Sequence, residues 1–116
     1  MAIHYQNAMD RAFHALGDGT RRQIISMLAR NGAQSANELR TPFNVAQPTI
    51  SRHLKVLETA GLVRLEITGR VHLFHLETAP LREAEDWIAS HRSFWEGTLR
   101  RLDLFVGTLD PEDGQS

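Results

Sequence analysis

The sequence predicts a mainly α-helical domain with one small β-hairpin, and two observations carry this fold class. Several segments place apolar residues at helical spacing between capping residues and glycines. One stretch, residues 62–76, instead alternates apolar and polar residues on both sides of Gly69, as two strands joined by a tight turn do. The 116 residues suit one domain with a modest core. We therefore expect residues 1–109 to form a single domain and residues 110–116 to form a flexible tail.

The composition restricts the class of protein. There is no cysteine, which excludes disulfides and thiolate metal sites and agrees with a cytoplasmic location. The sequence contains no apolar run near the length of a signal peptide or a membrane span, so we expect neither. Residues 1–76 contain nine Lys or Arg and five Asp or Glu, whereas residues 77–116 contain four and nine. This asymmetry permits a polyanionic partner for the basic part alone.

The first two predicted helices occupy residues 7–31. Residues 7–16 place four apolar side chains on one helical face, namely Met9, Ala12, Phe13 and Leu16. A second helix is expected to begin between Asp18 and Thr20, because Asp and Thr are good N-cap residues. It should run to Arg30, where an Asn-Gly pair follows.

A third, short helix is predicted after residue 35. Ser35 and Glu38 have the S-x-x-E spacing of a capping box. The helix that they open must be short, because Pro42 disfavours helical geometry at the residue before it. Phe43 and Val45 are expected to pack under the turn that follows.

The fourth predicted helix lies within residues 47–61 and is amphipathic. Pro48 suits the first turn of a helix, and Gly61 supplies the left-handed conformation at which helices often end. Its apolar face consists of Ile50, Leu54 and Leu57, and its opposite face of Ser51, Arg52 and Lys55. Such a face suits a helix that enters a DNA major groove, but an ordinary surface helix looks similar.

The segments around this helix distinguish the two interpretations. Two helices joined by a short turn, the second with a polar outer face, form a helix-turn-helix. Residues 62–67 and 71–76 then read as the strands of a hairpin with Gly69 at its tip. A helix-turn-helix followed directly by a hairpin is a winged helix.

A long last helix is predicted from Pro80 at least to Phe105, with Gly107 as a stop signal. Apolar residues recur in it every seven positions, at Leu81, Ile88, Trp95 and Leu102. A continuous helix over this range would be about 39 Å long, which exceeds what the body of the domain needs. Part of it is expected to pack on another subunit, and the alternative is a helix wrapped around its own core.

Two runs of residues resemble a known family. ALGDGTRRQII over residues 15–25 is similar to the opening motif of the ArsR-type winged-helix repressors. QPTISRHLKVL over residues 47–57, with AGLV at 60–63, resembles the family's DNA-reading segment. The similarity extends over about residues 10–106. It implies a bacterial homodimer whose first and last helices form the interface, and which binds near-palindromic operators, usually as a repressor.

The sequence departs from the family pattern at two positions. Gly19 stands where proline is common, and it weakens the preset start of the second helix. Ala46 stands where serine is common, which removes a possible cap or phosphate contact beside the reading helix.

The candidate DNA contacts lie on the reading helix and the wing. Arg52 and Lys55 can donate to guanine or to phosphates, and polar residues near the helix N-terminus can bind adenine edges or backbone oxygens. Arg70 at the wing tip suits a minor-groove or phosphate contact. The alternative is a solvated face. The full set is Gln47, Pro48, Thr49, Ser51, Arg52, His53, Lys55, Thr68, Gly69 and Arg70.

Two of the basic and aromatic residues on these elements have a second interpretation. His53 suits a packing role as well as a phosphate contact. Arg64 is a weaker candidate, because a strand arginine more often pairs with a carboxylate such as Glu66.

The expected dimer interface combines the first and last helices. It consists of Met9, Phe13, Trp87, Ile88, His91, Phe94, Trp95, Leu99, Leu102 and Phe105.

No metal site or cofactor is expected. The family's thiolate sites lie on the helix before the reading helix, here residues 36–40, and cysteine is absent. Its other site needs D-x-H and H-x-x-H/E pairs on the last helix, where only His91 is present. His72 and His75 are three apart on a strand and point to opposite faces.

The sequence thus predicts a metal-free, homodimeric DNA-binding repressor with double-stranded DNA as its partner, and it does not indicate whether an inducer exists. It contains no nucleophile motif or phosphate-binding loop of an enzyme. One alternative is a small-molecule sensor with an interface pocket lined by Trp87, His91, Phe94 and Trp95. Another is a protein–protein module that uses the long helix to hold a different partner and binds no DNA.

Overall fold

A computed structural model describes residues 7–109 of the chain. Its elements are α1 (Ala8–Leu16), α2 (Gly19–Asn31), α3 (Ala36–Arg40), α4 (Gln47–Thr59), β1 (Val63–Thr68), β2 (Val71–Leu76), α5 (Ala79–Ser90) and α6 (Arg92–Leu109). They belong to two compact units, one that ends at Ala84 and one that begins at Glu85. Within the described part, no helix combines the length and apolar character that a membrane span requires.

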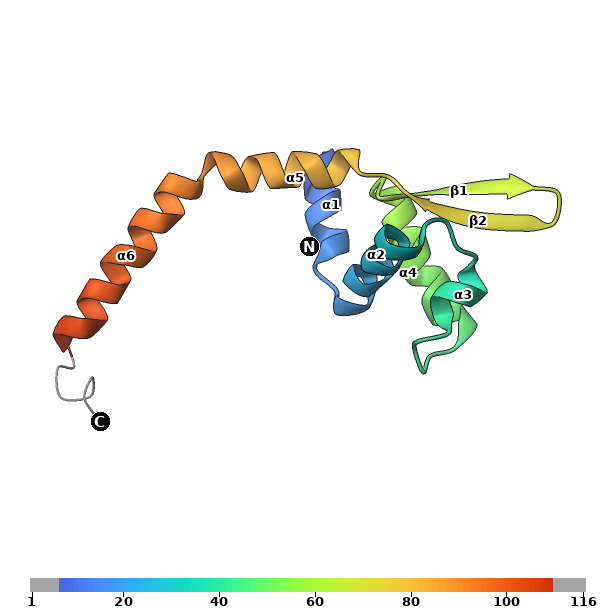
Figure 1. Ribbon diagram of the computed structural model, residues 1–116, viewed down its shortest axis with the longest axis horizontal. Coiled ribbons are helices and arrows are strands. Elements are labelled where there is room, and N and C mark those ends of the chain that lie inside the picture. The colour runs from blue at the N-terminus through green and yellow to red at the C-terminus, as the bar shows by residue number, and fades with distance from the viewer. Residues whose placement is uncertain (1–6, 110–116) are drawn as a thin grey trace, which may run out of the picture. The chain divides into compact units, whose positions relative to one another are not determined.

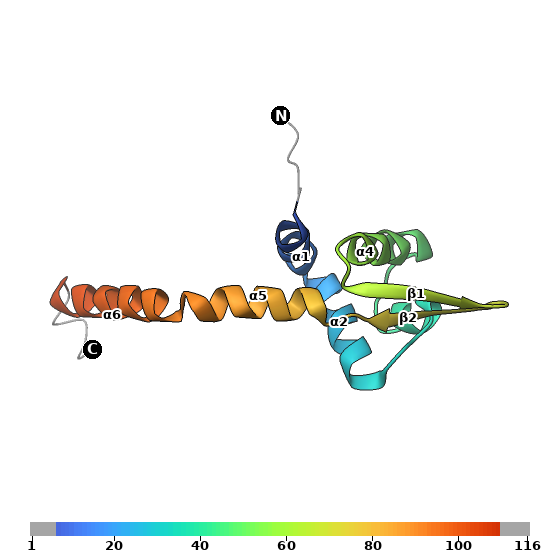
Figure 2. The same ribbon diagram turned by 90° about the horizontal axis from the view of Figure 1, so that it is seen from above.

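The first unit is built around the helix-turn-helix and the hairpin. Helix α4 packs against β1, whereas α2 and α3 pack against β2 (Figures 1 and 2). The buried core draws on every element from α1 to β2. Its largest fully buried side chains are Ile24, Leu39, Ile50, Leu57 and Leu62. The winged helix-turn-helix predicted from the sequence is therefore confirmed.

The helix ends follow the local signals in the sequence. Asp18 caps α2, and its carboxylate accepts a hydrogen bond from the Arg21 backbone N–H at 3.1 Å. The helix therefore begins at Gly19, although glycine, unlike proline, does not favour the helical conformation at this position. Ser35 and Glu38 form both halves of the predicted capping box, at 3.1 and 2.9 Å.

The apolar face predicted for α1 is buried in part, with Leu16 packed against the core. Ala12 and Ala15 are fully buried, whereas Phe13 is 36% exposed. Small side chains at these two positions let α1 approach the core, and the larger Phe13 lies beside this contact rather than within it.

The hairpin has a two-residue turn, because Thr68 pairs with Val71. Gly69 has φ of +62° and no non-glycine residue among those described has a positive φ, which is the pattern of a type II′ turn. A single bridge that the sequence did not reveal joins Gln34 to Phe74, through hydrogen bonds of 3.1 and 2.8 Å. It ties the segment before α3 to β2.

The prediction of a single long helix is wrong, because the helix is interrupted at His91, between α5 and α6 (Figure 1). The Trp87 carbonyl, which a continuous helix would pair with the His91 backbone N–H, lies near two side chains instead. The Ser90 hydroxyl donates to it at 2.8 Å, and the His91 ring Nδ1 lies 2.8 Å away. The His91 N–H donates to the Ile88 carbonyl at 3.1 Å. Side-chain competition for helix carbonyls bends and interrupts helices in this way.

Within the second unit, most apolar side chains of α6 are exposed. Among residues 92–107, the part of α6 whose side chains are described, none is buried. Its exposed large apolar side chains are Phe94, Trp95, Leu99, Leu102, Leu104, Phe105 and Val106. Residues 110–116, predicted to be a tail, lie outside the described residues. That the two units act as one domain stays a prediction.

The Asp18 cap gives a prediction about pH. The hydrogen bond from the Arg21 backbone N–H lowers the pKa of the Asp18 carboxyl below its usual value of 3.8, and His53 and Arg21 add to this. A lowered folded-state pKa means that the stabilisation is complete above the usual pKa and is lost as the pH falls below it. We expect Asp18→Asn, which keeps a good cap, to lose less stability than the wild type between pH 7 and pH 3.

Urea unfolding at both pH values and a fixed protein concentration measures this difference. Asp18→Ala should cost about 1 kcal/mol at pH 7, as loss of a cap does. Asp86→Asn, a change at an exposed carboxylate, should follow the wild-type pH dependence. Equal acid losses in the wild type and Asp18→Asn would contradict the prediction.

Candidate nucleic-acid interface

Helix α4 is fixed by its inner face and its C-terminal end. Ile50, Leu54 and Leu57 are all buried, as predicted. The Leu62 N–H donates to the Leu57 carbonyl at 2.9 Å and the Gly61 N–H to the Glu58 carbonyl at 3.0 Å. With Gly61 at φ of +75°, this is a Schellman motif. The last turn of α4 therefore has a defined orientation.

The N-terminal end of α4 is held less firmly. Ala46 is the N-cap, and its methyl side chain cannot accept a hydrogen bond from the first turn. The first turn relies on the Thr49 N–H donating to the Ala46 carbonyl at 3.0 Å. Donors at such an end, together with the helix dipole, favour a phosphate.

The outer face of α4 carries the predicted contacts. Its exposed members are Gln47, Pro48, Ser51, Arg52 and Lys55. Thr49 is half-buried, and its hydroxyl accepts from Arg52 Nη2 at 3.4 Å. The Lys55 ammonium has no hydrogen bond or ion pair with the described residues. Two cations on one exposed face have the charge and reach to bind DNA.

His53 lies on the inner side of α4 and is 19% exposed. Its Nδ1 is 3.2 Å from Arg21 Nη1 and 3.9 Å from the Asp18 carboxylate. His53 Nδ1 thus faces both a guanidinium donor and a carboxylate. This position favours the packing role for His53, and its contact with DNA stays a prediction.

Arg21 connects three helices, a role that the sequence did not predict. Its Nε donates to the Ala15 carbonyl at 2.7 Å and its Nη2 to the His14 carbonyl at 3.2 Å, both at the end of α1. Arg22 donates similarly to the Leu16 carbonyl at 2.7 Å. Because Arg21 also meets His53, it orients α4 relative to α1 and α2. Thirty-two positions separate these two residues, so no local pattern could have paired them.

The wing tip is exposed at Thr68, Gly69 and Arg70. Ile67 and Val71 beside it are also exposed, at 58% and 54%, so the tip can approach a surface.

One ion pair and one carboxylate–histidine contact involve the strands of the hairpin. Arg64 does pair with a carboxylate, but its partner is Glu77 at 2.8 Å. Glu66, the expected partner, lies 2.7 Å from His75. Arg64 is opposite His75 and Glu66 is opposite Leu73, so each contact joins a residue to the one two positions beyond its direct partner.

Comparison with known proteins identifies the family. A model of a helix-turn-helix domain matches residues 16–66. The chain is 31% identical to the transcriptional repressor SdpR of Bacillus subtilis over 80 residues, which are 69% of this chain and 88% of that protein. A crystal structure of an ArsR family transcriptional regulator has a TM-score of 0.71 and 34% identity, and covers 78% of this chain and 98% of its own. The chain belongs to the ArsR family.

A further solved structure shares the fold of this ArsR-family regulator. It is a homodimeric winged helix-turn-helix DNA-binding domain from Mycobacterium bovis, known from solution NMR. It is 22% identical with a TM-score of 0.56, and covers 81% of this chain and 83% of its own. At that identity the likeness supports the fold alone.

The residues predicted for a dimer interface are mostly exposed in this ArsR-family regulator. In the second unit, Trp87 is 40% exposed and stacks on His91 with ring centroids 4.4 Å apart. Phe94 and Trp95 meet edge to face at 5.2 Å. In the first unit, Met9 is half-buried. Among residues 7–109, no three His, Asp or Glu side chains come together as metal ligands would.

The contacts of Arg21 predict a specific loss of stability. Arg21→Ala removes its donors to two α1 carbonyls and to His53, and we expect the free energy of unfolding to fall by roughly 2 kcal/mol. Arg30→Ala is the matched control, because Arg30 lies on the same helix and contacts no described residue through a hydrogen bond or ion pair. Urea unfolding measures both variants. A cost at Arg21 no larger than at Arg30 would refute the role.

Proposed function

We propose that this ArsR-family regulator is a repressor that binds near-palindromic operator DNA as a homodimer and needs no metal. The observation that carries the proposal is the exposed outer face of α4. That face presents Arg52 and Lys55 while the opposite face and the C-terminal end are fixed by the core.

The geometry suits insertion into a major groove. A recognition helix reads base edges with its N-terminal residues, and here Gln47, Ser51 and Arg52 lie exposed on the first two turns. Arginine donates to guanine O6 and N7, and glutamine pairs with adenine. The exposed Arg70 of the wing would bind flanking phosphate or the minor groove.

The apolar surface of α6 supports the homodimer. Leu99 is 60% exposed and Leu102 is 53% exposed, and an apolar helix face with no buried side chain among residues 92–107 needs a partner to cover it. A second copy provides two reading helices related by a two-fold axis. They would enter successive major grooves about 34 Å apart, which requires a near-palindromic operator.

Two further parts of the proposal concern metal and location. The chain has no cysteine, and the acidic side chains of the second unit, such as Glu85 and Asp86, lie exposed on α5. We infer control without a metal in a reducing cytoplasm. A partner other than a second copy is the alternative that the dimer experiment below decides.

The first test of this proposal concerns operator affinity. Arg52→Ala combined with Lys55→Ala should weaken binding roughly a hundredfold, because each cationic contact contributes a factor of about ten or more. If both side chains bind phosphate, the slope of log affinity against log salt should also fall by about 1.8. Fluorescence anisotropy measures both quantities, on an operator that the wild-type protein selects from random duplexes.

The control for this variant removes the same charge elsewhere. Arg82→Ala combined with Arg100→Ala changes two exposed arginines outside the proposed DNA surface, and should leave affinity within about threefold at moderate salt. Unchanged affinity in the Arg52 and Lys55 variant, or failure to select any duplex, would refute DNA reading. A large change on adding or chelating zinc would refute the metal-free part.

The second prediction concerns assembly. Leu99→Asp combined with Leu102→Asp should give a monomer in sedimentation velocity, because a charge in an apolar interface loses its hydration without a partner. Leu104→Asp is the matched control. Leu104 is 68% exposed on the same helix, and helical geometry places it away from the Leu99–Leu102 face. A wild-type monomer, or a dimer that survives the double change, would contradict the proposed interface.

A further inference from the structure

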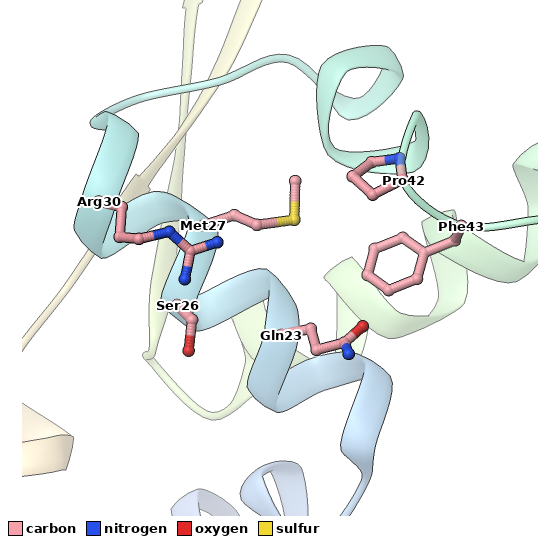
Figure 3. Close-up of a pocket in the computed structure, with 6 residues that line it drawn as sticks. All are labelled: Gln23, Ser26, Met27, Arg30, Pro42 and Phe43. Carbon is pink, nitrogen blue, oxygen red and sulfur yellow. The ribbon is translucent and has the colours of Figure 1, made fainter.

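A pocket in the first unit lies between α2 and the turn that joins α3 to α4 (Figure 3). Its volume is about 410 Å³, within the range of small-molecule sites. It is lined by Gln23, Ser26, Met27, Arg30, Pro42 and Phe43. This place differs from the α5–α6 aromatic residues that the sequence suggested for a sensor pocket.

The pocket has a polar side and an apolar side. Gln23, Ser26 and Arg30 follow one another along α2 at spacings of three and four, so they share a face. Met27 is 8% exposed and Phe43 is half-buried. Figure 3 shows Met27 extending toward Pro42, and the Phe43 ring facing α2 across the pocket.

Its polar groups have no protein partner in the part of the chain that the structure describes. The side chains of Gln23, Ser26 and Arg30 make no hydrogen bond or ion pair there. This contrasts with Arg21 and Arg22 on the same helix, which donate to α1 carbonyls. Arg30 therefore offers a guanidinium fork for a carboxylate, beside an apolar floor of Met27 and Phe43.

We propose that this pocket binds a small aromatic carboxylate, with the carboxylate on Arg30 and the ring against Met27 and Phe43. The side chains of Ser26 and Gln23 can form hydrogen bonds with further polar substituents of the ligand. Arg30 is exposed, so a neutral molecule of the same shape would lack only the charge-assisted hydrogen bonds to the guanidinium. Charge and shape together define the ligand class.

The pocket is connected to the reading helix. The Phe43 N–H donates to the Arg40 carbonyl at 2.9 Å, and the same turn runs into Ala46, the N-cap without a side-chain bond. A ligand held between Arg30 and Phe43 would link α2 to this turn and shift the first turn of α4. Its effect on operator affinity rests on the proposed function, whereas its binding does not.

NMR titration of the full chain with naphthalene-2-carboxylate tests the binding. We expect millimolar affinity, on the order of that of other small ligands, with amide shifts at Ser26, Arg30 and Phe43. Naphthalene-2-carboxamide should bind about tenfold more weakly than the carboxylate. The Arg30→Gln variant should bind the carboxylate more weakly than the wild type does, by a similar factor. Arg82→Gln, at an exposed arginine on α5, is the matched control and should bind as the wild type does.

Four results would overturn the site: no carboxylate binding, equal binding of the carboxamide, no effect of Arg30→Gln, or shifts centred on Trp87 and Phe94. Operator titration with saturating carboxylate tests the connection to α4, and should change affinity about fivefold or more. Unchanged operator affinity would overturn that connection. Absence of any operator binding without ligand would instead refute the proposed function and leave the NMR result standing.

Discussion

The guanidinium of Arg21 is the contact on which the arrangement of the first unit depends. The last carbonyls of a helix have no partners within it and carry its negative partial charge. Arg21 supplies both donors and charge to the α1 carbonyls of His14 and Ala15, and its remaining nitrogen meets His53 of α4. One side chain thereby links α1, α2 and α4. Asp18 accepts the Arg21 backbone N–H, so the same residue also begins α2 at a defined position.

The two ends of α4 differ in how many contacts hold them. The inner face and the Schellman motif at Gly61 fix the C-terminal part, and His53 adds the Arg21 contact. The N-terminal part begins at Ala46, which has no side-chain cap. A phosphate bound at the first turn would supply the missing partner for its backbone donors. DNA and the proposed ligand near Phe43 would thus act on the same, less constrained end, and this is where affinity is most easily changed.

The sequence predicted the parts of the fold that local signals determine. The capping box of Ser35, the left-handed end at Gly61 and the turn at Gly69 each depend on residues a few positions apart, and all were confirmed. The pairing of Arg21 with His53, the bridge from Gln34 to Phe74 and the pocket join segments that are distant in sequence, so no periodicity reveals them. The break at His91 was missed for another reason. The apolar pattern continues through it, and the interruption arises from side chains that reach back to one carbonyl.

Helix α6 remains the least self-sufficient element. Most helical stability in proteins comes from packing of an apolar face, and none of the side chains described in α6, those of residues 92–107, is buried. Trp95, Leu99, Leu102 and Val106 follow one another at spacings of four, three and four, which is the seam of a two-stranded coiled coil. If a second copy covers this seam, ordering of α6 and dimerisation form one equilibrium, and the stability of both depends on protomer concentration. Paired reading helices would then exist only above that concentration, so the regulator's own expression level would set how strongly it occupies a two-fold operator.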